Sequence, residues 1–184
     1  MNEQLLDGIN SIAGEFGLLD SAIRFFAVDG LYVLGAIALL FGLLELRSSF
    51  AHGMQVGTAM MIAAALAGVV LLVSGSLISE TRPFVHDQDT VRLISHGADN
   101  SFPSDHALAA AAIAGVASLA WRRWAVVFLG LAFLVGFARV AAGVHYPGDV
   151  LASWLIGGSA ALAAWYVTPA IFNARRGVRG PAAA

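Results

Sequence analysis

The sequence predicts an all-α integral membrane protein, a bundle of about five transmembrane helices with an amphipathic interfacial helix at its N-terminus. Of its 184 residues, 59% are hydrophobic and 12% are charged. The charges lie between long apolar runs, which is typical of a polytopic membrane protein. The connections between these runs alternate in arginine content, as expected of a chain that crosses a bilayer repeatedly. The length fits a single domain over residues 1–184.

The composition also excludes several functional classes. A net charge of −2 gives no reason to expect a nucleic-acid partner. The chain has no cysteine, which removes disulfides, thiol catalysis and cysteine–zinc sites. All ten basic residues are arginine, so Schiff-base chemistry on a lysine is excluded as well.

The first 20 residues are too polar to cross a bilayer and lack the long apolar run of a signal peptide. Their pattern predicts an amphipathic helix over residues 1–20, which lies at the membrane interface or packs on the bundle. The apolar side chains at helical spacing are Leu5, Ile9, Ile12, Phe16 and Leu19.

Five apolar segments follow, and each is a predicted transmembrane helix. The first carries one charge near its start, Asp29, which is either an interfacial or a functional residue. The third is short and rich in alanine, as expected of a helix packed closely on all sides. Residues 173–184 form a predicted cytoplasmic tail. The five segments are Phe25–Leu44, Val56–Ser79, 107–121, Trp124–Ala138 and Val150–Phe172.

The arginines assign the two sides of the membrane. Most of them fall on one side of the five crossings, which the positive-inside tendency makes the cytoplasmic side. The extracytoplasmic side then receives Glu80–Pro103 and Ala141–Gly148. After the first crossing, three arginines on that side go against the tendency, which predicts that they serve a ligand. They are Arg82, Arg92 and Arg139.

Several extracytoplasmic residues have chemistry suited to a phosphate group. Arginine is a permanently charged planar fork that binds phosphate oxygens, and Arg82 and Arg139 supply two such forks. Pro103-Ser104 precedes an apolar run, which predicts a helix start with Ser104 as the N-cap. The free amides of that helix start can seat an anion. His106, one turn inside, would face the anion.

The stretch from Arg139 to Asp149 adds a candidate nucleophile. Pro147 is predicted to open the next helix, which brings Asp149 into its first turn, near His145. A histidine oriented by a carboxylate acts as a nucleophile or as a proton shuttle. The alternative for this stretch is a membrane-edge turn whose charges anchor the helix ends.

In combination, these residues resemble the signature of an enzyme family. Arg82-Pro83, Pro103-Ser104-Asp105-His106 and Arg139-x5-His145-x3-Asp149 are similar to the three motifs of the type-2 phosphatidic acid phosphatase superfamily. The wider tract that ends in His96-Gly-Ala-Asp-Asn-Ser-Phe-Pro-Ser-Asp-His106 is similar to its bacitracin-resistance branch, the undecaprenyl-diphosphate phosphatases. The resemblance covers residues from about 20 to 172.

The resemblance implies a lipid phosphatase that works without a metal or another cofactor. His145 would be the nucleophile that forms a phosphohistidine, Asp149 would orient and activate it, and His106 would protonate the leaving group. The implied substrate is undecaprenyl diphosphate or a related polyprenyl diphosphate in the bilayer of a bacterial cell (inner) membrane. It would be hydrolysed on the extracytoplasmic side to the monophosphate and inorganic phosphate. The implied phosphate ligands are Arg82 and Arg139, with Ser104 and Asp105 through their amides.

Three alternatives remain open at this point. The same fold would suit a phosphatidic acid or a phosphatidylglycerophosphate phosphatase. A non-enzymatic lipid-binding or transport protein could use the arginines to bind a lipid headgroup. Nothing in the sequence indicates an oligomeric state.

Two positions depart from the superfamily's motifs. The lysine that usually stands seven residues before the first-motif arginine is Gly75 here, so one counter-charge for phosphate is missing. Arg92, His86 or His96 is the predicted replacement, and His96 and Arg92 are candidate headgroup contacts. Asp105 stands where the second motif usually has glycine. If Asp105 contributes only its backbone N–H to phosphate binding, the replacement is tolerable, whereas its charge would repel phosphate. The undecaprenyl branch has the same aspartate at this position, so Asp105 favours a diphosphate substrate.

Asp87-Gln-Asp89-Thr superficially matches the Asp-x-Asp-x-Thr motif of magnesium-dependent aspartyl phosphatases. That motif needs a preceding buried strand in an α/β sheet, which these apolar spans cannot provide. His86 and His96 are therefore predicted to lie near the lipid headgroup rather than to bind a metal with these aspartates. No metal site is predicted.

Overall fold

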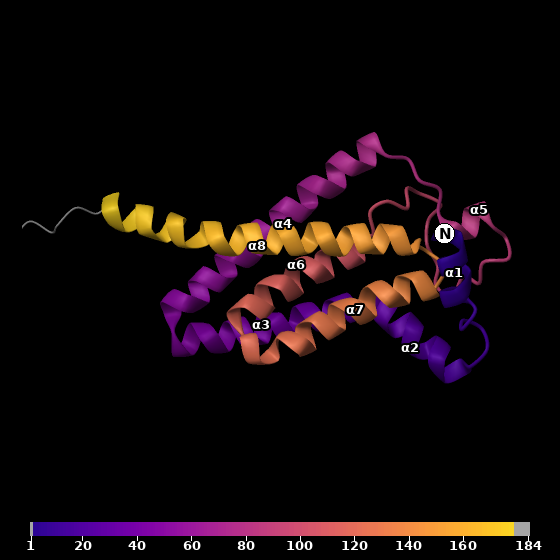
Figure 1. The fold of residues 1–184 in the computed structure, drawn as a ribbon. Coiled ribbons are helices and arrows are strands. Elements are labelled where there is room, and N and C mark those ends of the chain that lie inside the picture. The colour runs from indigo at the N-terminus through magenta and orange to yellow at the C-terminus, as the bar shows by residue number, and fades with distance from the viewer. Residues whose placement is uncertain (1, 179–184) are drawn as a thin grey trace, which may run out of the picture.

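Long helices make up most of the computed structural model, which describes residues 2–178 (Figure 1). No β-strand occurs among these residues, so the predicted all-α class is confirmed. Residues 179–184 of the predicted tail lie outside the described part of the chain. The helices are α1 (Asn2–Asn10), α2 (Gly17–Val28), α3 (Gly30–Ser48), α4 (Phe50–Leu77), α5 (Pro83–His86), α6 (Asp105–Ala120), η1 (Arg122–Trp124), α7 (Ala125–Ala141) and α8 (Pro147–Val178).

Four of the predicted spans are helices that are long and apolar enough to cross a membrane. The fifth, α6, has 16 residues and measures about 24 Å at the helical rise, less than the roughly 30 Å of a bilayer core. It still joins the two ends of the bundle, packed among α3, α4, α7 and α8 (Figure 1). Because protein surrounds it, α6 need not match the bilayer thickness. The four longer spans are Gly30–Ser48, Phe50–Leu77, Arg122–Ala141 and Pro147–Phe172.

Small residues allow α6 and α8 to approach each other closely, as predicted for this segment. A Cβ atom added to Gly115 would lie 2.5 Å from the Ala161 Cβ, and one added to Gly157 would lie 2.5 Å from the Leu108 carbonyl oxygen. Such distances leave no room for a larger side chain. The contact therefore fixes the N-terminal ends of both helices relative to each other.

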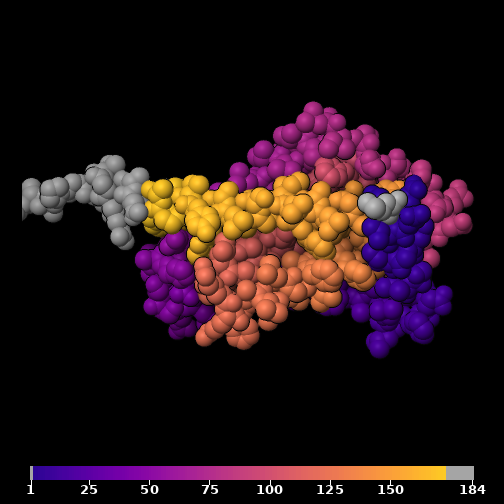
Figure 2. Space-filling view, in the orientation of Figure 1, coloured from indigo at the N-terminus to yellow at the C-terminus, as the bar shows by residue number. Residues whose placement is uncertain are grey.

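The predicted helix over residues 1–20 is divided into two. A turn separates α1 from α2, and its Gly14 has a φ of +88°, which glycine adopts without steric cost. The Asp20 carboxylate accepts a hydrogen bond from the Gly14 N–H at 2.9 Å and thereby stabilises the turn. The helix α1 packs across the end of the bundle, where its Leu6 is buried against Tyr146 and Val150 (Figures 1 and 2).

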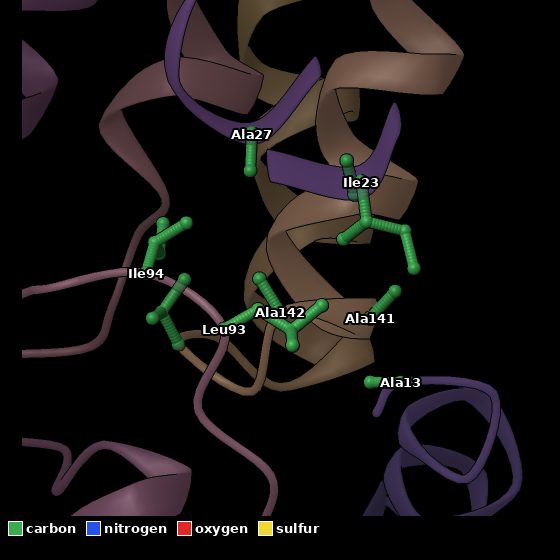
Figure 3. Packing of buried hydrophobic residues seen from close by; sticks show 9 residues of the cluster. Ala13, Ile23, Ala27, Leu93, Ile94, Ala141 and Ala142 are labelled. Atoms are coloured by element: carbon green, nitrogen blue, oxygen red, sulfur yellow. The ribbon is translucent and has the colours of Figure 1, made fainter. Parts of the chain in front are cut away.

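The first membrane span begins later than predicted. Residues Phe25–Val28 belong to α2, and Asp29 separates this helix from α3. Asp29 is exposed, which favours the interfacial alternative for this acid. Figure 3 shows how α2 contributes to a buried cluster that joins the loop before α6 to the C-terminal end of α7. The labelled side chains are Ala13, Ile23, Ala27, Leu93, Ile94, Ala141 and Ala142.

The connections lie at two opposite ends of the bundle, as expected when successive connections alternate between the two sides of the membrane. The α3–α4 and α6–α7 connections lie at one end (Figure 1). The long loop before α6, the short helices α1 and α5, and the α7–α8 turn lie at the other. All the predicted phosphate-binding and catalytic residues are therefore at one end.

Candidate active site

His145 lies in the short turn between α7 and α8 and is fully buried. The turn depends on Gly143, whose φ is +73° and whose Cβ, if it had one, would lie 2.5 Å from the Val91 carbonyl oxygen. Pro147 begins α8, as predicted, and Asp149 lies in the first turn of this helix. The local sequence thus places the histidine in the α7–α8 turn and the aspartate in the first turn of the helix that follows it.

The hydrogen bonds of His145 identify which ring nitrogen carries the proton. Its Nδ1 lies 2.9 Å from the Ser101 carbonyl oxygen, which can only accept, so Nδ1 is the donor. The lone pair is then on Nε2. Two guanidinium nitrogens face that atom, Nη1 of Arg82 at 3.2 Å and Nη2 of Arg139 at 3.4 Å. An unprotonated imidazole nitrogen therefore lies between two permanent cations.

Asp149 is connected to His145 through Ser101. Its Oδ2 atom lies 3.7 Å from His145 Nδ1, beyond hydrogen-bonding distance. This oxygen accepts from the Ser101 hydroxyl at 2.6 Å and from the Tyr146 N–H at 2.9 Å. Ser101 thus holds the histidine with its carbonyl group and the carboxylate with its hydroxyl group. Sequence reasoning missed Ser101, because one serine in a polar loop carries no distinguishing signal.

Burial lowers the pKa of His145 below the usual 6.5. The Asp149 carboxylate opposes this shift, whereas the positive charges of Arg139 and Arg82 add to it. The imidazole is consequently neutral around pH 7, which is the state in which Nε2 can act as a nucleophile.

Arg82 is fixed by hydrogen bonds from all three of its nitrogens. It precedes Pro83 in an extended conformation, as residues before proline usually do, and Pro83 starts α5. The Arg82 side chain is buried and donates to Asp99 Oδ1 at 2.8 Å, to the Val144 carbonyl at 2.9 Å and to the Asn100 carbonyl at 3.0 Å. This arginine therefore ties the long loop to the His145 turn.

Arg139 lies in the last turn of α7 and keeps unused hydrogen-bonding capacity. Its Nη1 donates to the Ala27 carbonyl of α2 at 3.0 Å, and its Nη2 faces His145. Among the residues that the structure describes, its Nε and the Ser104 hydroxyl are two of three buried side-chain polar atoms without a partner. A buried donor without a partner is costly, and two of the predicted phosphate ligands carry such donors.

The Asp105 side chain contacts His106 at the start of α6 and lies near Arg139. Ser104 occupies the predicted N-cap position, but its side chain makes no capping hydrogen bond. The Asp105 Oδ1 atom accepts instead from the His106 N–H at 2.8 Å and lies 3.1 Å from His106 Nδ1 and 3.9 Å from Arg139 Nη2. The carboxylate thus orients His106 and leaves its Nε2 available to a ligand.

The structure separates the two candidate headgroup contacts. The ring of His96 lies beside that of His145, with centroids 6.1 Å apart. The guanidinium of Arg92 is exposed and lies 4.8 Å from the Phe84 ring centroid, so Arg92 is not brought to the histidines. At the position of the missing lysine, Gly75 faces open space.

The region of the aspartyl-phosphatase-like motif has no metal-binding geometry. Asp87 and Asp89 are exposed on a loop, where Asp87 Oδ1 accepts from the Asp89 N–H. His86 lies 3.4 Å from Glu3 of α1. Within residues 2–178, no group of three or more histidine, cysteine, aspartate or glutamate side chains could hold a metal ion.

Comparisons with known proteins agree with these motifs. Residues 53–172 match the family model of the PAP2 superfamily. The chain is 35% identical to undecaprenyl-diphosphatase BcrC of Bacillus subtilis (strain 168), covering 85% of this chain and 78% of that protein. It is 32% identical to bacitracin transport permease protein BcrC of Bacillus licheniformis, covering 88% of this chain and 77% of that protein.

A similar solved structure is that of LpxE from Aquifex aeolicus, with a TM-score of 0.73 and 25% identity over 89% of this chain and 93% of that chain. The family match covers more than half of the sequence, and the apolar helices are those of a multi-pass membrane protein. The resemblance predicted from the three motifs is confirmed. The chain belongs to the PAP2 superfamily.

Proposed function

We propose that the protein is a lipid phosphatase that hydrolyses undecaprenyl diphosphate, or a related polyprenyl diphosphate, to the monophosphate and inorganic phosphate. The observation that carries this proposal is the buried His145 Nε2 with guanidinium nitrogens at 3.2 and 3.4 Å. Such a site attracts a phosphoryl group and stabilises its charge. The undecaprenyl-diphosphatase named among the relatives supports this choice of substrate.

In the proposed first step, His145 Nε2 attacks the terminal phosphorus in line with the bridging oxygen. The bond from phosphorus to that oxygen breaks, the lipid monophosphate leaves with a proton from His106, and a phosphohistidine forms. Arg82 and Arg139 stabilise the charge on the equatorial oxygens without a metal ion. In the second step, a water molecule that loses a proton to His106 attacks the phosphohistidine and releases inorganic phosphate.

An apolar groove offers a place for the lipid chain. Figure 1 shows α3 and α4 diverging from their shared turn, and two cavities of about 280 and 180 Å³ lie along this opening. Both are lined by Met60 and Ile113, so they form one path across the face of α6. The second cavity reaches Ala109, one helical turn from Asp105. We propose that the groove holds the isoprenoid chain while the diphosphate reaches His145.

The test compares phosphate release by the purified protein in detergent on a polyprenyl diphosphate, phosphatidic acid and phosphatidylglycerophosphate. The proposal expects the highest kcat/KM on the diphosphate. A preference for either of the other lipids would assign the protein to a different phosphatase activity. A second candidate, transport without hydrolysis, is retained because one relative is named a bacitracin transport permease protein. Absence of phosphate release from all three lipids would favour that candidate.

We further propose that the His145 end of the bundle is extracytoplasmic, because the arginines near the other end obey the positive-inside tendency. The chain has no native cysteine, so single cysteines report accessibility directly. In intact cells, Ala98→Cys in the long loop should react with a membrane-impermeant maleimide, whereas Ser49→Cys between α3 and α4 should react only after lysis. Both positions are exposed. The reverse pattern would contradict the orientation.

His106→Ala should impair phosphatidic acid hydrolysis much more than diphosphate hydrolysis. A lipid phosphate whose second pKa is about 6 leaves readily without a proton, whereas an alkoxide does not. We expect about a 10²- to 10⁴-fold loss in the first step on phosphatidic acid, the usual contribution of a general acid. Single-turnover rates isolate this step from hydrolysis of the phosphohistidine. Equal losses on the two lipids would remove His106 from the acid role.

A further inference from the structure

Two chains of contacts converge on His145. The first, described above, runs from Arg139 through Asp105 to His106. In the second, Arg82 donates to Asp99 Oδ1 at 2.8 Å, and the same oxygen lies 3.5 Å from His96 Nδ1. Each arginine that faces His145 Nε2 is thus paired with an aspartate that also contacts a histidine. The first histidine belongs to a family motif, whereas His96 lies outside the three motifs.

His96 is partly buried between exposed neighbours in the long loop before α6. Its neighbours Ser95 and Gly97 are exposed, but only 19% of the His96 side chain is. The ring packs edge-on against His145, with an interplanar angle of 77°. Its Nδ1 lies 3.2 Å from the Gly97 carbonyl, an acceptor, so Nδ1 is the donor and Nε2 is left for a ligand.

A diphosphate has a second phosphate, and both arginines of the site face the atom that would attack the first one. Both of them face His145 Nε2 and therefore serve the phosphorus that is attacked. The motif lysine is replaced by Gly75, which faces open space, and Arg92 extends over Phe84 instead. Neither arginine is therefore left for the second phosphate of the substrate.

We infer that His96 is a substrate-binding residue that donates from Nε2 to the phosphate that is not attacked. This inference rests on the proposed function and specifies how the site prefers a diphosphate to a lipid with one phosphate. It also explains why the loop holds this ring through both Asp99 and Gly97, since an oriented ring loses less entropy on binding.

The charges around His96 are consistent with this role. Burial lowers its pKa, the positive charges of Arg82 and Arg139 add to the shift, and the Gly97 carbonyl and Asp99 oppose it. The adjacent His145 is buried and neutral, so it does not compete for the proton. A bound diphosphate brings negative charge that offsets both arginines and favours the protonated ring. His96 then becomes a cationic donor only when the substrate is present.

The test measures kcat/KM of His96→Ala on a polyprenyl diphosphate and on phosphatidic acid. On the diphosphate we expect kcat/KM to fall by about 10- to 100-fold, mainly through KM, because a hydrogen bond to a charged group contributes a free energy of that size. On phosphatidic acid we expect kcat/KM to fall by less than about threefold, because that lipid lacks the second phosphate. His96→Gln keeps an N–H donor and should recover part of the loss. The matched control is His52→Ala, on α4 with its ring packed against Trp165, which should behave as the unaltered protein on both lipids.

Equal losses on both lipids, or no loss on either, would overturn the role of His96. Melting temperatures show whether a variant is folded; if His96→Ala is not, the same comparison is made with His96→Gln, for which a smaller but still diphosphate-selective loss is expected. Failure of the unaltered protein to hydrolyse the diphosphate would refute the proposed function itself. The two failures are distinguishable, because the second is seen before any substitution is made.

Discussion

Replacing His145 with alanine should lower phosphate release from every lipid substrate by about 10⁴-fold or more, the scale seen when a catalytic nucleophile is removed. Without Nε2 no phosphohistidine can form. Rapid mixing with a ³²P-labelled polyprenyl diphosphate, followed by an alkaline quench that preserves phosphohistidine, should label the unaltered protein and leave His145→Ala unlabelled. The substitution removes a fully buried ring, so a melting curve must accompany the assay.

A matched control is His52→Ala. This histidine lies on α4, where its ring packs against Trp165 with centroids 6.4 Å apart, and it belongs to neither chain of contacts. It should retain both labelling and turnover. A first-step rate in His145→Ala close to that of the unaltered protein would exclude the phosphohistidine mechanism, whatever the substrate.

Arg139→Lys should lower kcat/KM by about 10²- to 10³-fold, although it preserves the charge. Loss of one stabilising donor has an effect of this size in other charge-stabilising sites. The Arg139 fork uses Nη1 on the Ala27 carbonyl while Nη2 faces His145 Nε2, which a single ammonium group cannot reproduce. The unpartnered Nε would be lost as well.

The control for this substitution is Arg47→Lys, at an exposed position in the last turn of α3 and at the other end of the bundle. It should leave kcat/KM unchanged. If Arg139→Lys retained full activity at an unchanged melting temperature, a positive charge alone would be sufficient. The requirement for a guanidinium group that reaches both Ala27 and the site of the phosphate would then be wrong.

The sequence by itself predicted four of the membrane spans and the end of the bundle that carries the candidate site. Four apolar runs correspond to helices long enough to cross, because a bilayer admits only chain segments whose backbone groups are satisfied internally. Pro147 marked the start of α8, since its fixed φ suits a first helical position. With five crossings, the loop before α6 and the turn at His145 had to emerge at the same end.

The N-terminal helix and the short span show where pattern alone was insufficient. The apolar spacing of residues 1–20 continues through Gly14, although the chain reverses there around a positive φ that Asp20 stabilises. The third apolar run looks like a short span, and only its packing among four helices explains how so short a helix joins both ends of the bundle.

Only the tertiary structure decided how the site residues are connected. Ser101 is 44 residues from His145 and 48 from Asp149, yet its carbonyl and hydroxyl groups hold both. The sequence did not decide whether Asp105 contributes only its backbone N–H or also its side chain. The structure shows that its carboxylate contacts His106 and lies near Arg139. Such contacts depend on the close packing of small residues in α6 and α8, which brings distant segments within hydrogen-bonding distance. Local sequence patterns report the conformation of each segment but not which partners packing will bring to it.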